Sequence, residues 1–415
     1  MRKEKDSRLQ FEKGFYPNSG HSRFAVSTTR LLRDMNARQC LRVLRDKGPL
    51  SRAEIARELG TTRATVGNAI RELMASGLVS AADETDEVTQ VGRPGADVRL
   101  EPDGAFFFGV EVQKKLFTVQ LFDFAMEVRE TKEIAVNLEI NRLDKVTSKI
   151  AESSLALIAQ ERLPEEKIYG MGVSIPGIVS STGRVFIPWV PKWQGIDLKA
   201  SLSTRLPKYW LLKICNNAAA VAFSLCESLP EAEQQDFLFI LLGPGVGSAL
   251  VRHGKVEKGS HGFAGEIGHL IMNPRLSRPD QVFGRLASYE RFRPFLDSRK
   301  PPAEALQELA AQSKLGKRLE AALLDWADVL STGLLNAIHV TDPGHIILGG
   351  PTAVLYPRVE MRILDALRER LLPGLEVPPI QLAQFSSNEV ATGAAAYLRQ
   401  DLFSLPGLRP RDGFH

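Results

Sequence analysis

The sequence predicts an α/β protein preceded by a small domain of three helices and a β-hairpin. Helical patterns dominate residues 27–100, whereas beyond Pro102 apolar strand patterns alternate with helical ones, as in α/β folds. The chain has 415 residues, which is enough for two or three domains. Its 44% hydrophobic and 25% charged residues are typical of a soluble globular protein.

Composition and charge exclude several classes of protein. No apolar run approaches the length of about eighteen residues that a transmembrane helix needs, and the charged N-terminus lacks the apolar core of a secretory signal. Three scattered cysteines favour a reducing cytoplasm. Residues 1–82 contain 16 Lys and Arg against 8 Asp and Glu, a net charge of +8, while the remainder has 37 against 41, a net of −4. This asymmetry predicts a polyanionic partner for the N-terminal part alone.

Apolar spacing and capping signals predict the three N-terminal helices. Apolar residues recur at helical spacing over residues 27–46. Ser51 and Glu54 then form a capping-box signature, and Gly60 ends the second helix. The third helix lies in TTRATVGNAIRELMASGLV, with a threonine N-cap and Gly77 at its C-cap. Its inward-facing residues are Val66, Ile70 and Leu73.

Two short helices joined by a glycine turn form a helix-turn-helix, whose second helix can enter a major groove of DNA. The outward positions that offer groups for phosphates and base edges are Thr62, Arg63, Thr65, Asn68 and Arg71. An extended stretch, VGRPGADVRL, is interpreted as a wing whose Arg93 would lie along or within a minor groove. The alternative is a three-helix bundle that only dimerises. The ordered helices and wing on the basic part of the chain favour binding to double-stranded DNA.

The body contains several strands that run into glycine-rich turns. These are FFFGVEVQKKLFTVQLFDF, YGMGVSIPGIVSSTGRV, DFLFILLGPGVGSALVRHGKVEKG and HIILGGP. Such turns can bring backbone amides close to a phosphate, but they are equally common in plain hairpins. In GSHGFAGEIGHL, Glu266 and His269 are three residues apart, a spacing that suits a metal, proton transfer or a polar ligand.

Taken together, GVSIPG, LGPGVGSALV, GSHGFAGEIGH and DPGHIILGG, with the helix-turn-helix and its GRP wing, resemble the ROK family of bacterial sugar-responsive repressors and sugar kinases. The resemblance covers about residues 28–400. It implies an actin-like ATPase fold of two α/β lobes with a sugar in the cleft between them.

The resemblance and the composition together suggest a division of the chain. Residues 1–26 are expected to be a basic, disordered tail, and residues 27–100 the winged helix-turn-helix. Residues 101–212, completed by a C-terminal segment at about 390–415, would form the first lobe. Residues 213–389 would form the second lobe, with the effector cleft and the oligomerisation surface.

Two departures from the family pattern argue against kinase activity. Where family kinases carry an Asp-x-Gly-Gly-Thr-type loop for ATP, this chain has Glu111-Val112-Gln113-Lys114-Lys115. Where the family has its catalytic aspartate, this chain has Asn217, whose neutral amide cannot act as a base near pH 7. We therefore expect no enzymatic activity, no catalytic residue and no cofactor.

The zinc site of the family is also expected to be missing. In the family a Gly-His histidine is followed by a run of three cysteines, whereas here no cysteine follows His269 in LIMNPRLSRPDQVFGRLASYE. One histidine without soft partners cannot close a tetrahedral site, so no metal is expected.

The remaining interpretation of Glu266 and His269 is ligand binding, because the resemblance places both against sugar hydroxyls. Asn216 matches another sugar contact, and Asn217 lies beside it. Two further family contacts are changed: Trp189 stands in place of an asparagine, and Ala287 in place of a glutamate. The expected effector-binding residues are Asn216, Asn217, Glu266, His269 and Trp189. The alternative is that Glu266 and His269 only form an internal hydrogen bond.

The favoured hypothesis is a cytoplasmic transcriptional regulator, a repressor of carbohydrate-related genes, that binds an inverted-repeat operator as a homodimer or homotetramer and senses a sugar or sugar derivative. A second hypothesis keeps DNA binding but makes the body an oligomerisation and protein-docking scaffold without an effector. An active sugar kinase is the least favoured. No membrane partner is expected.

Overall fold

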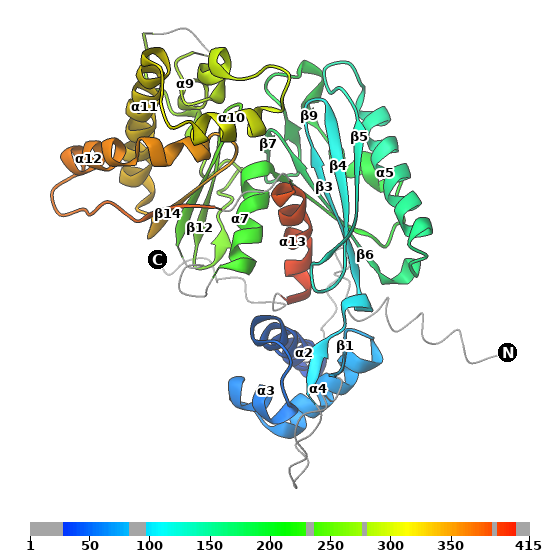
Figure 1. Cartoon of the computed structure of the whole chain (residues 1–415). Coiled ribbons are helices and arrows are strands. Elements are labelled where there is room, and N and C mark those ends of the chain that lie inside the picture. Colours follow the sequence, from blue (N-terminus) through cyan, green and yellow to red (C-terminus); the bar gives the residue numbers. More distant parts are fainter. Residues whose placement is uncertain (1–27, 83–96, 230–235, 276–279, 384–387, 404–415) are drawn as a thin grey trace.

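The computed structural model describes residues 28–82, 97–229, 236–275, 280–383 and 388–403 (Figure 1). A small N-terminal domain lies against one end of an α/β body that contains two five-stranded sheets. The predicted tail, the tip of the wing with Arg93 and the last twelve residues lie outside the described residues.

The N-terminal domain has the predicted three helices and the stem of a wing. They are α2 (Thr28–Lys47), α3 (Arg52–Glu58), α4 (Arg63–Ala75), β1 (Val79–Ala81) and β2 (Val98–Leu100). The predicted capping box is confirmed, because the Ser51 side chain accepts from the Glu54 amide and the Glu54 carboxylate accepts from the Ser51 amide. Thr62 caps α4. The strands β1 and β2 pair antiparallel, as the stem of a wing requires.

The predicted core of this domain is also confirmed. Val66, Ile70 and Leu73 are buried on the inner face of α4. They pack with Leu41 and Leu44 of α2 in one apolar cluster. The opposite face of α4 is therefore left for solvent or for a partner.

The first lobe is built on a sheet in the order β10-β6-β3-β4-β5. Its strands are β3 (Phe106–Val112), β4 (Leu116–Phe122), β5 (Val128–Ala135), β6 (Ile168–Ile175) and β10 (Leu211–Asn216). Because β10 pairs in parallel with β6, the first sheet continues to Asn216, past the boundary at residue 212 that the sequence suggested. A small sheet of β7 (Ile178–Val179), β8 (Val185–Phe186) and β9 (Gln194–Ile196) extends this lobe.

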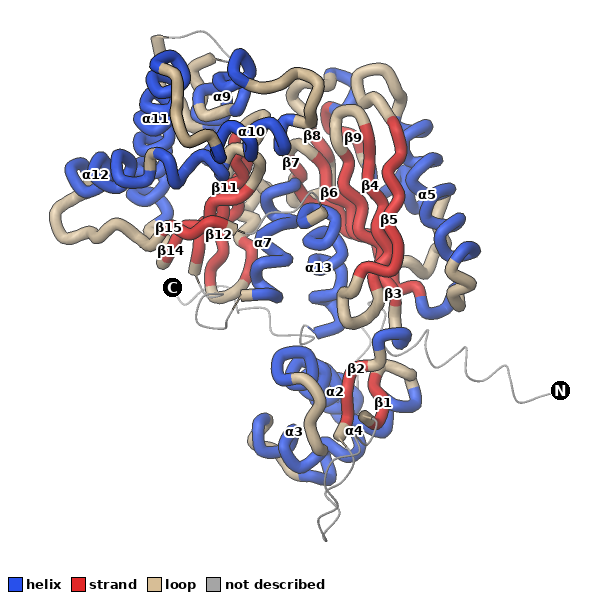
Figure 2. The backbone as a smooth tube through the Cα atoms, in the orientation of Figure 1, coloured by secondary structure: helices blue, strands red, loops and turns tan. Residues whose placement is uncertain are grey.

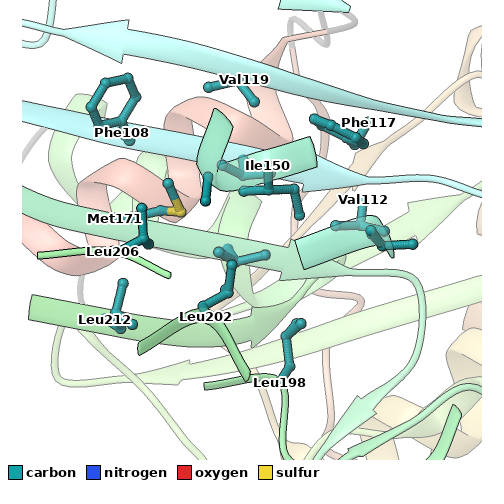
Figure 3. Packing of buried hydrophobic residues seen from close by; sticks show 14 of the residues in the cluster. Phe108, Val112, Phe117, Val119, Ile150, Met171, Leu198, Leu202, Leu206 and Leu212 are labelled. Carbon is teal, nitrogen blue, oxygen red and sulfur yellow. The ribbon is translucent and has the colours of Figure 1, made fainter. Parts of the chain in front are cut away.

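Alternate residues of β3 face opposite sides of the first sheet. Phe108 and Val112 belong to an apolar cluster with α5 (Leu143–Gln160) and α6 (Leu198–Ser203), which cover one face (Figure 3). The other face is covered by α13 (Glu389–Phe403), since a Cβ at Gly109 would lie 2.1 Å from the carbonyl oxygen of Ala391. Short 3₁₀ helices at Pro102–Gly104, Glu165–Lys167 and Pro191–Trp193 join the elements of this lobe.

The second lobe is built on a sheet in the order β13-β12-β11-β14-β15. Its strands are β11 (Phe237–Leu242), β12 (Val246–Arg252), β13 (Lys255–Val256), β14 (His345–Gly349) and β15 (Ile380–Leu382). Its helices are α9 (Phe283–Leu286), α10 (Pro302–Ala311), α11 (Lys317–Thr341) and α12 (Glu360–Arg370), with 3₁₀ turns η4 (Ile267–His269), η5 (Tyr289–Phe295) and η6 (Ala353–Arg358).

Helix α11 contains a largely apolar segment at residues 325–340. Its length and composition alone would allow it to cross a membrane. However, Trp326, Leu330 and Leu334 are fully buried against the second sheet. It is therefore the core helix of this lobe.

Two helices separate the two sheets. Helix α7 (Asn217–Ser228) packs on β11 and β12, while α13 packs on β3, β6 and β10. The two helices contact each other along their length, and Figure 2 shows the pair between the sheets. The layers are thus first sheet, α13, α7 and second sheet, and the last turn of α13 reaches α2 of the N-terminal domain.

Candidate functional site

The outer face of α4 carries most of the side chains predicted to contact DNA. Thr62, Arg63, Asn68 and Arg71 are exposed, and Thr65 is half-buried. The Thr62 hydroxyl accepts a hydrogen bond from the Thr65 amide at 3.2 Å and lies 2.9 Å from the Thr65 hydroxyl. The two threonines therefore organise the first turn of the helix as well as facing outward. Arg63, Asn68 and Arg71 present the longer polar groups.

A second group of polar side chains links the two lobes. We call Asn216, Asn217, Ser174 and Glu266 the amide–carboxyl site. Asn216 ends β10 and caps α7, because its Oδ1 accepts from the Ala219 amide at 2.7 Å. Its Nδ2 donates to Oε1 of Glu266 at 3.2 Å. Since Glu266 belongs to the second lobe, this hydrogen bond joins the two lobes.

The surroundings of Glu266 favour its neutral form. Burial raises the pKa of Glu266 to about 7, and the hydrogen bond from Asn216 opposes this shift only in part. The neighbouring Gly268 must be a glycine, because a Cβ there would lie 2.0 Å from the carbonyl oxygen of Val246. This close approach holds η4, and with it Glu266, against β12.

The structure adds two polar residues that were not predicted as effector contacts, Ser174 and Glu111. Ser174, near the end of β6, donates from its hydroxyl to Oδ1 of Asn217 at 2.6 Å. Glu111 is paired with Ser174 in the register of β3 and β6, so both side chains project from the same face of the sheet. The signal was present in the sequence, because Glu111 is a charged residue inside the apolar run FFFGVEV.

Glu111 is an incompletely satisfied buried carboxyl group. Its side chain is 6% exposed, and its Oε2 has no hydrogen-bond partner. Burial raises the pKa of Glu111 to about 7; a hydrogen bond from Gln113 opposes the shift and the charge of Glu133 adds to it. A protonated Glu111 can donate a hydrogen bond, which a carboxylate cannot.

His269 and Trp189 are less closely tied to this group. His269 ends η4 and is exposed, while Trp189 is 41% exposed with the Lys114 ammonium 5.5 Å from its ring centroid. Within the described part of the chain, no hydrogen bond connects either side chain to Asn216 or Glu266. Glu266 does form an internal hydrogen bond, with Asn216 as its donor. Ala287 is buried, and its carbonyl accepts from Trp326 Nε1.

Residues 111–115, which were expected in place of a phosphate loop, run from the end of β3 into a closed hairpin turn. The Gln113 amide donates to the Leu116 carbonyl at 2.8 Å, and the carbonyls of Lys114 and Lys115 accept from the Leu138 and Val136 amides. Among the described residues, no group of three or more His, Cys, Asp or Glu side chains is placed to hold a metal ion. Burial raises the pKa of Cys40, Cys215 and Cys226 to about 12, which keeps these thiols protonated.

These features define a class of protein: a two-lobed α/β body of the sugar-kinase type joined to a winged helix-turn-helix. The ROK family profile matches residues 107–401, and a MarR family profile matches residues 32–87. The chain belongs to the ROK family.

Similar sequences include both regulators and kinases. The xylose repressor of Caldicellulosiruptor bescii is 22% identical over 404 residues, which cover 91% of this chain and 98% of that protein. The xylose repressor of Bacillus spizizenii is 20% identical over 369 residues, which cover 84% of this chain and 91% of that protein. The N-acetyl-D-glucosamine kinase of Shigella flexneri is 26% identical over 248 residues, which cover 54% of this chain and 78% of that enzyme.

Solved structures show the same fold. A ROK family transcriptional regulator described as a homologue of the E. coli MLC protein matches with a TM-score of 0.70 and 20% identity, covering 90% of this chain and 97% of that chain. A ROK hexokinase from Thermus thermophilus matches with a TM-score of 0.56 and 22% identity, covering 71% of this chain and 99% of that chain. The predicted fold class is confirmed.

The buried carboxyl group of Glu111 predicts a pH-dependent stability. Its pKa in the folded protein, about 7, lies above its usual value of 4.5, so the folded state binds the proton more tightly and loses stability as the pH rises through this window. The Glu111→Gln variant should lose the part of this fall that Glu111 contributes and keep the part contributed by Glu266, whose pKa is also about 7. Relative to the variant, the native protein should become less stable by at most about 3 kcal/mol between pH 5 and about 8. Denaturant unfolding across this pH range measures the difference.

The matched control is Glu133→Gln, because Glu133 is exposed and only adds repulsion to Glu111. The Glu133→Gln variant should still lose most of the stability that the native protein loses as the pH rises. An unchanged pH profile in Glu111→Gln would show that Glu111 stays charged in the folded protein.

Proposed function

We propose that this protein is a DNA-binding transcriptional repressor whose body senses a sugar or sugar derivative. The main support is that one chain has both the exposed polar face of α4 and the amide–carboxyl site. The similarity to two proteins named xylose repressors, over nearly the whole length of each, supports the same conclusion.

In this proposal α4 enters a major groove. Arg63, Asn68 and Arg71 contact base edges or phosphates, and Thr62 and Thr65 contact phosphate through their hydroxyls. Arg93, which lies outside the described residues, would contact the minor groove from the wing. A homodimer or homotetramer would place two such helices on the half-sites of an inverted-repeat operator.

The effector would bind at the amide–carboxyl site. Glu266 and the two asparagines offer acceptors and donors for sugar hydroxyl groups in a partly buried setting, where such bonds are stronger than in water. His269 and the exposed ring of Trp189 would contribute a further polar contact and a stacking surface. A hydroxyl group of the ligand would compete with Asn216 for Oε1 of Glu266 or bind Oε2 of the same carboxyl group.

Phosphoryl transfer is not part of this proposal. Asn217 cannot take a proton from a sugar hydroxyl, and its Oδ1 already accepts from Ser174. The amide of Gln113, in the turn that corresponds to the phosphate loop, is committed to a backbone hydrogen bond. The protein would thus keep the sugar site of a kinase fold without its chemistry, and it would act in the cytoplasm, where its three thiols stay reduced.

We also propose the division of the chain into functional units. The winged helix-turn-helix occupies residues 27–100. The first lobe extends from residue 101 through β10 and includes α13, and the second lobe begins with α7 and continues to the start of α13.

The DNA interface predicts that Arg63→Ala and Asn68→Ala each weaken binding by about tenfold or more, because each removes a contact to a base or a phosphate. The probe is a duplex selected from a random-sequence pool by the native protein, and fluorescence anisotropy measures its affinity. If Arg63 contacts a phosphate, Arg63→Ala should also reduce the salt dependence of binding.

The matched control for this experiment is Arg293→Ala, which removes an arginine that is 71% exposed in the second lobe. Its affinity for the duplex should stay within about twofold of the native value. Equal losses in Arg63→Ala and Arg293→Ala would mean that general charge, and not the face of α4, determines binding.

The ligand site predicts a sugar-dependent gain in thermal stability. D-xylose, D-glucose and N-acetyl-D-glucosamine are suitable probes because related proteins carry these sugars in their names. A ligand at about 100 times its dissociation constant stabilises the folded state by about 2.7 kcal/mol. Glu266→Gln should reduce or abolish the shift in melting temperature, since it replaces one acceptor oxygen with a donor.

Glu257→Gln is the matched control, because Glu257 is an exposed carboxylate nine residues before Glu266. It should respond to the sugars as the native protein does. The absence of any shift with a wider panel of sugars, polyols and sugar phosphates would favour a scaffold without an effector.

A further inference from the structure

Helices α7 and α13 connect the amide–carboxyl site with the DNA-binding domain. We propose that this helix pair transmits to α2 whether the amide–carboxyl site is occupied by a ligand. The inference rests on the proposed function, because it supplies the route by which a ligand changes DNA binding. The relay consists of contacts at four places: the first turn of α7, the interface between α7 and α13, the contact of Lys258 with Tyr397 of α13, and the last turn of α13.

The relay begins at the N-terminus of α7. Asn216 uses its Oδ1 to cap the helix and its Nδ2 to bind Glu266 in the second lobe. A ligand that binds Glu266, or a movement of the second lobe, therefore acts on the residue that holds the first turn of α7 in place. The Asn216 side chain therefore belongs to the proposed ligand site and also caps α7.

The two helices touch backbone to backbone. A Cβ at Gly393 of α13 would lie only 1.8 Å from the carbonyl oxygen of Ala220 in α7. The neighbouring residues of both helices are mostly alanine and are buried. With so little side-chain material between them, a shift of α7 cannot be absorbed by rotamer changes, and α13 must move with it.

A buried ion pair fixes the far ends of the two helices together. Arg399 is 5% exposed and donates through Nη2 to Oε2 of Glu227 at 2.8 Å. Its Nη1 donates to the carbonyl oxygen of Phe124 at 3.0 Å. Arg399 therefore ties α13 to the end of α7 and to the loop after β4.

The second lobe also contacts the middle of α13. Lys258 donates to the hydroxyl of Tyr397, and its ammonium lies 4.6 Å from the centroid of that ring. The same ring stacks on Phe223 of α7, with 4.1 Å between centroids. A displacement of either the second lobe or α7 therefore reaches α13 at Tyr397.

The last turn of α13 is held by two arginines of α2. Arg38 donates through Nη1 to the carbonyl oxygens of Asp401 and Leu402, which lie at the negative end of the helix dipole. The guanidinium of Arg45 lies 5.0 Å from the ring centroid of Phe403, and that of Arg399 lies 5.2 Å from the same centroid. The Phe403 ring thus contacts one arginine of α13 and one arginine of the DNA-binding domain.

Hydrogen exchange of the full-length protein tests the relay without DNA or sugar. Asn216→Ala removes the cap of α7 and the bond to Glu266, and it should speed exchange in α7 by about fivefold. The relay predicts that exchange also rises in α13 and in α2, by about twofold or more. Asn216→Ser is the second variant, because its hydroxyl retains the cap but cannot donate to Glu266 as the longer amide does.

The matched control is Asp197→Ala. Asp197 caps α6 by accepting from the Ala200 amide at 2.8 Å, and α6 lies on the opposite face of the first sheet. Faster exchange should then be confined to α6 and its neighbour α5. Equal increases at α2 in Asn216→Ala and Asp197→Ala would indicate general destabilisation and overturn the relay.

The contribution of the last contact is measured by a double-mutant cycle. In an Arg38→Met background, Asn216→Ala should still speed exchange in α7 and α13, but its added effect on α2 should disappear. Two results would contradict the proposal. Asn216→Ala could speed exchange in α2 equally with and without Arg38, or it could fail to speed exchange in α2 when Arg38 is present. A protein that bound neither DNA nor sugar would still give these exchange results, so failure of the proposed function remains distinguishable.

Discussion

The close contact between α7 and α13 is the constraint on which the arrangement of the body depends. The inner face of each sheet is largely apolar and must be covered by a helix. Helix α13 covers the first sheet, α7 covers the second sheet, and the two helices pack against each other. The approach of Gly393 to Ala220 requires small residues along the contact, which explains the alanine-rich sequences NAAAVAF and ATGAAAY. The same contact places the start of α7 at the boundary between the lobes and the end of α13 at the DNA-binding domain.

The amide–carboxyl site follows from this geometry. Strand β10 delivers Asn216 to the N-terminus of α7, and the glycine-rich turn of the second lobe brings Glu266 within hydrogen-bonding distance of it. Burial raises the pKa of Glu266 to about 7, and it does the same for Glu111, which is paired with Ser174 in the register of β3 and β6. In the function that we propose, Glu266 would bind hydroxyl groups of the effector, because its carboxyl group can donate when protonated and accept when ionised.

Much of the local structure could be predicted from the sequence, since it depends on short-range rules. The capping box at Ser51 and the buried face of α4 follow from spacing alone. Glu266 and Asn216 were identified through family motifs, but the bond between them was not, because fifty residues separate them. The contact of Arg38 with the end of α13 joins residues more than 360 positions apart and has no signal in the local pattern.

We propose that a sugar bound in the body changes the affinity of the N-terminal domain for DNA. The most direct measurement is the affinity of the native protein for its selected duplex, followed as the sugar that stabilises the protein is added. The affinity should fall by about fivefold or more when the sugar site is saturated, as expected for coupled sites. An affinity that stays constant while calorimetry shows saturated sugar binding would contradict it.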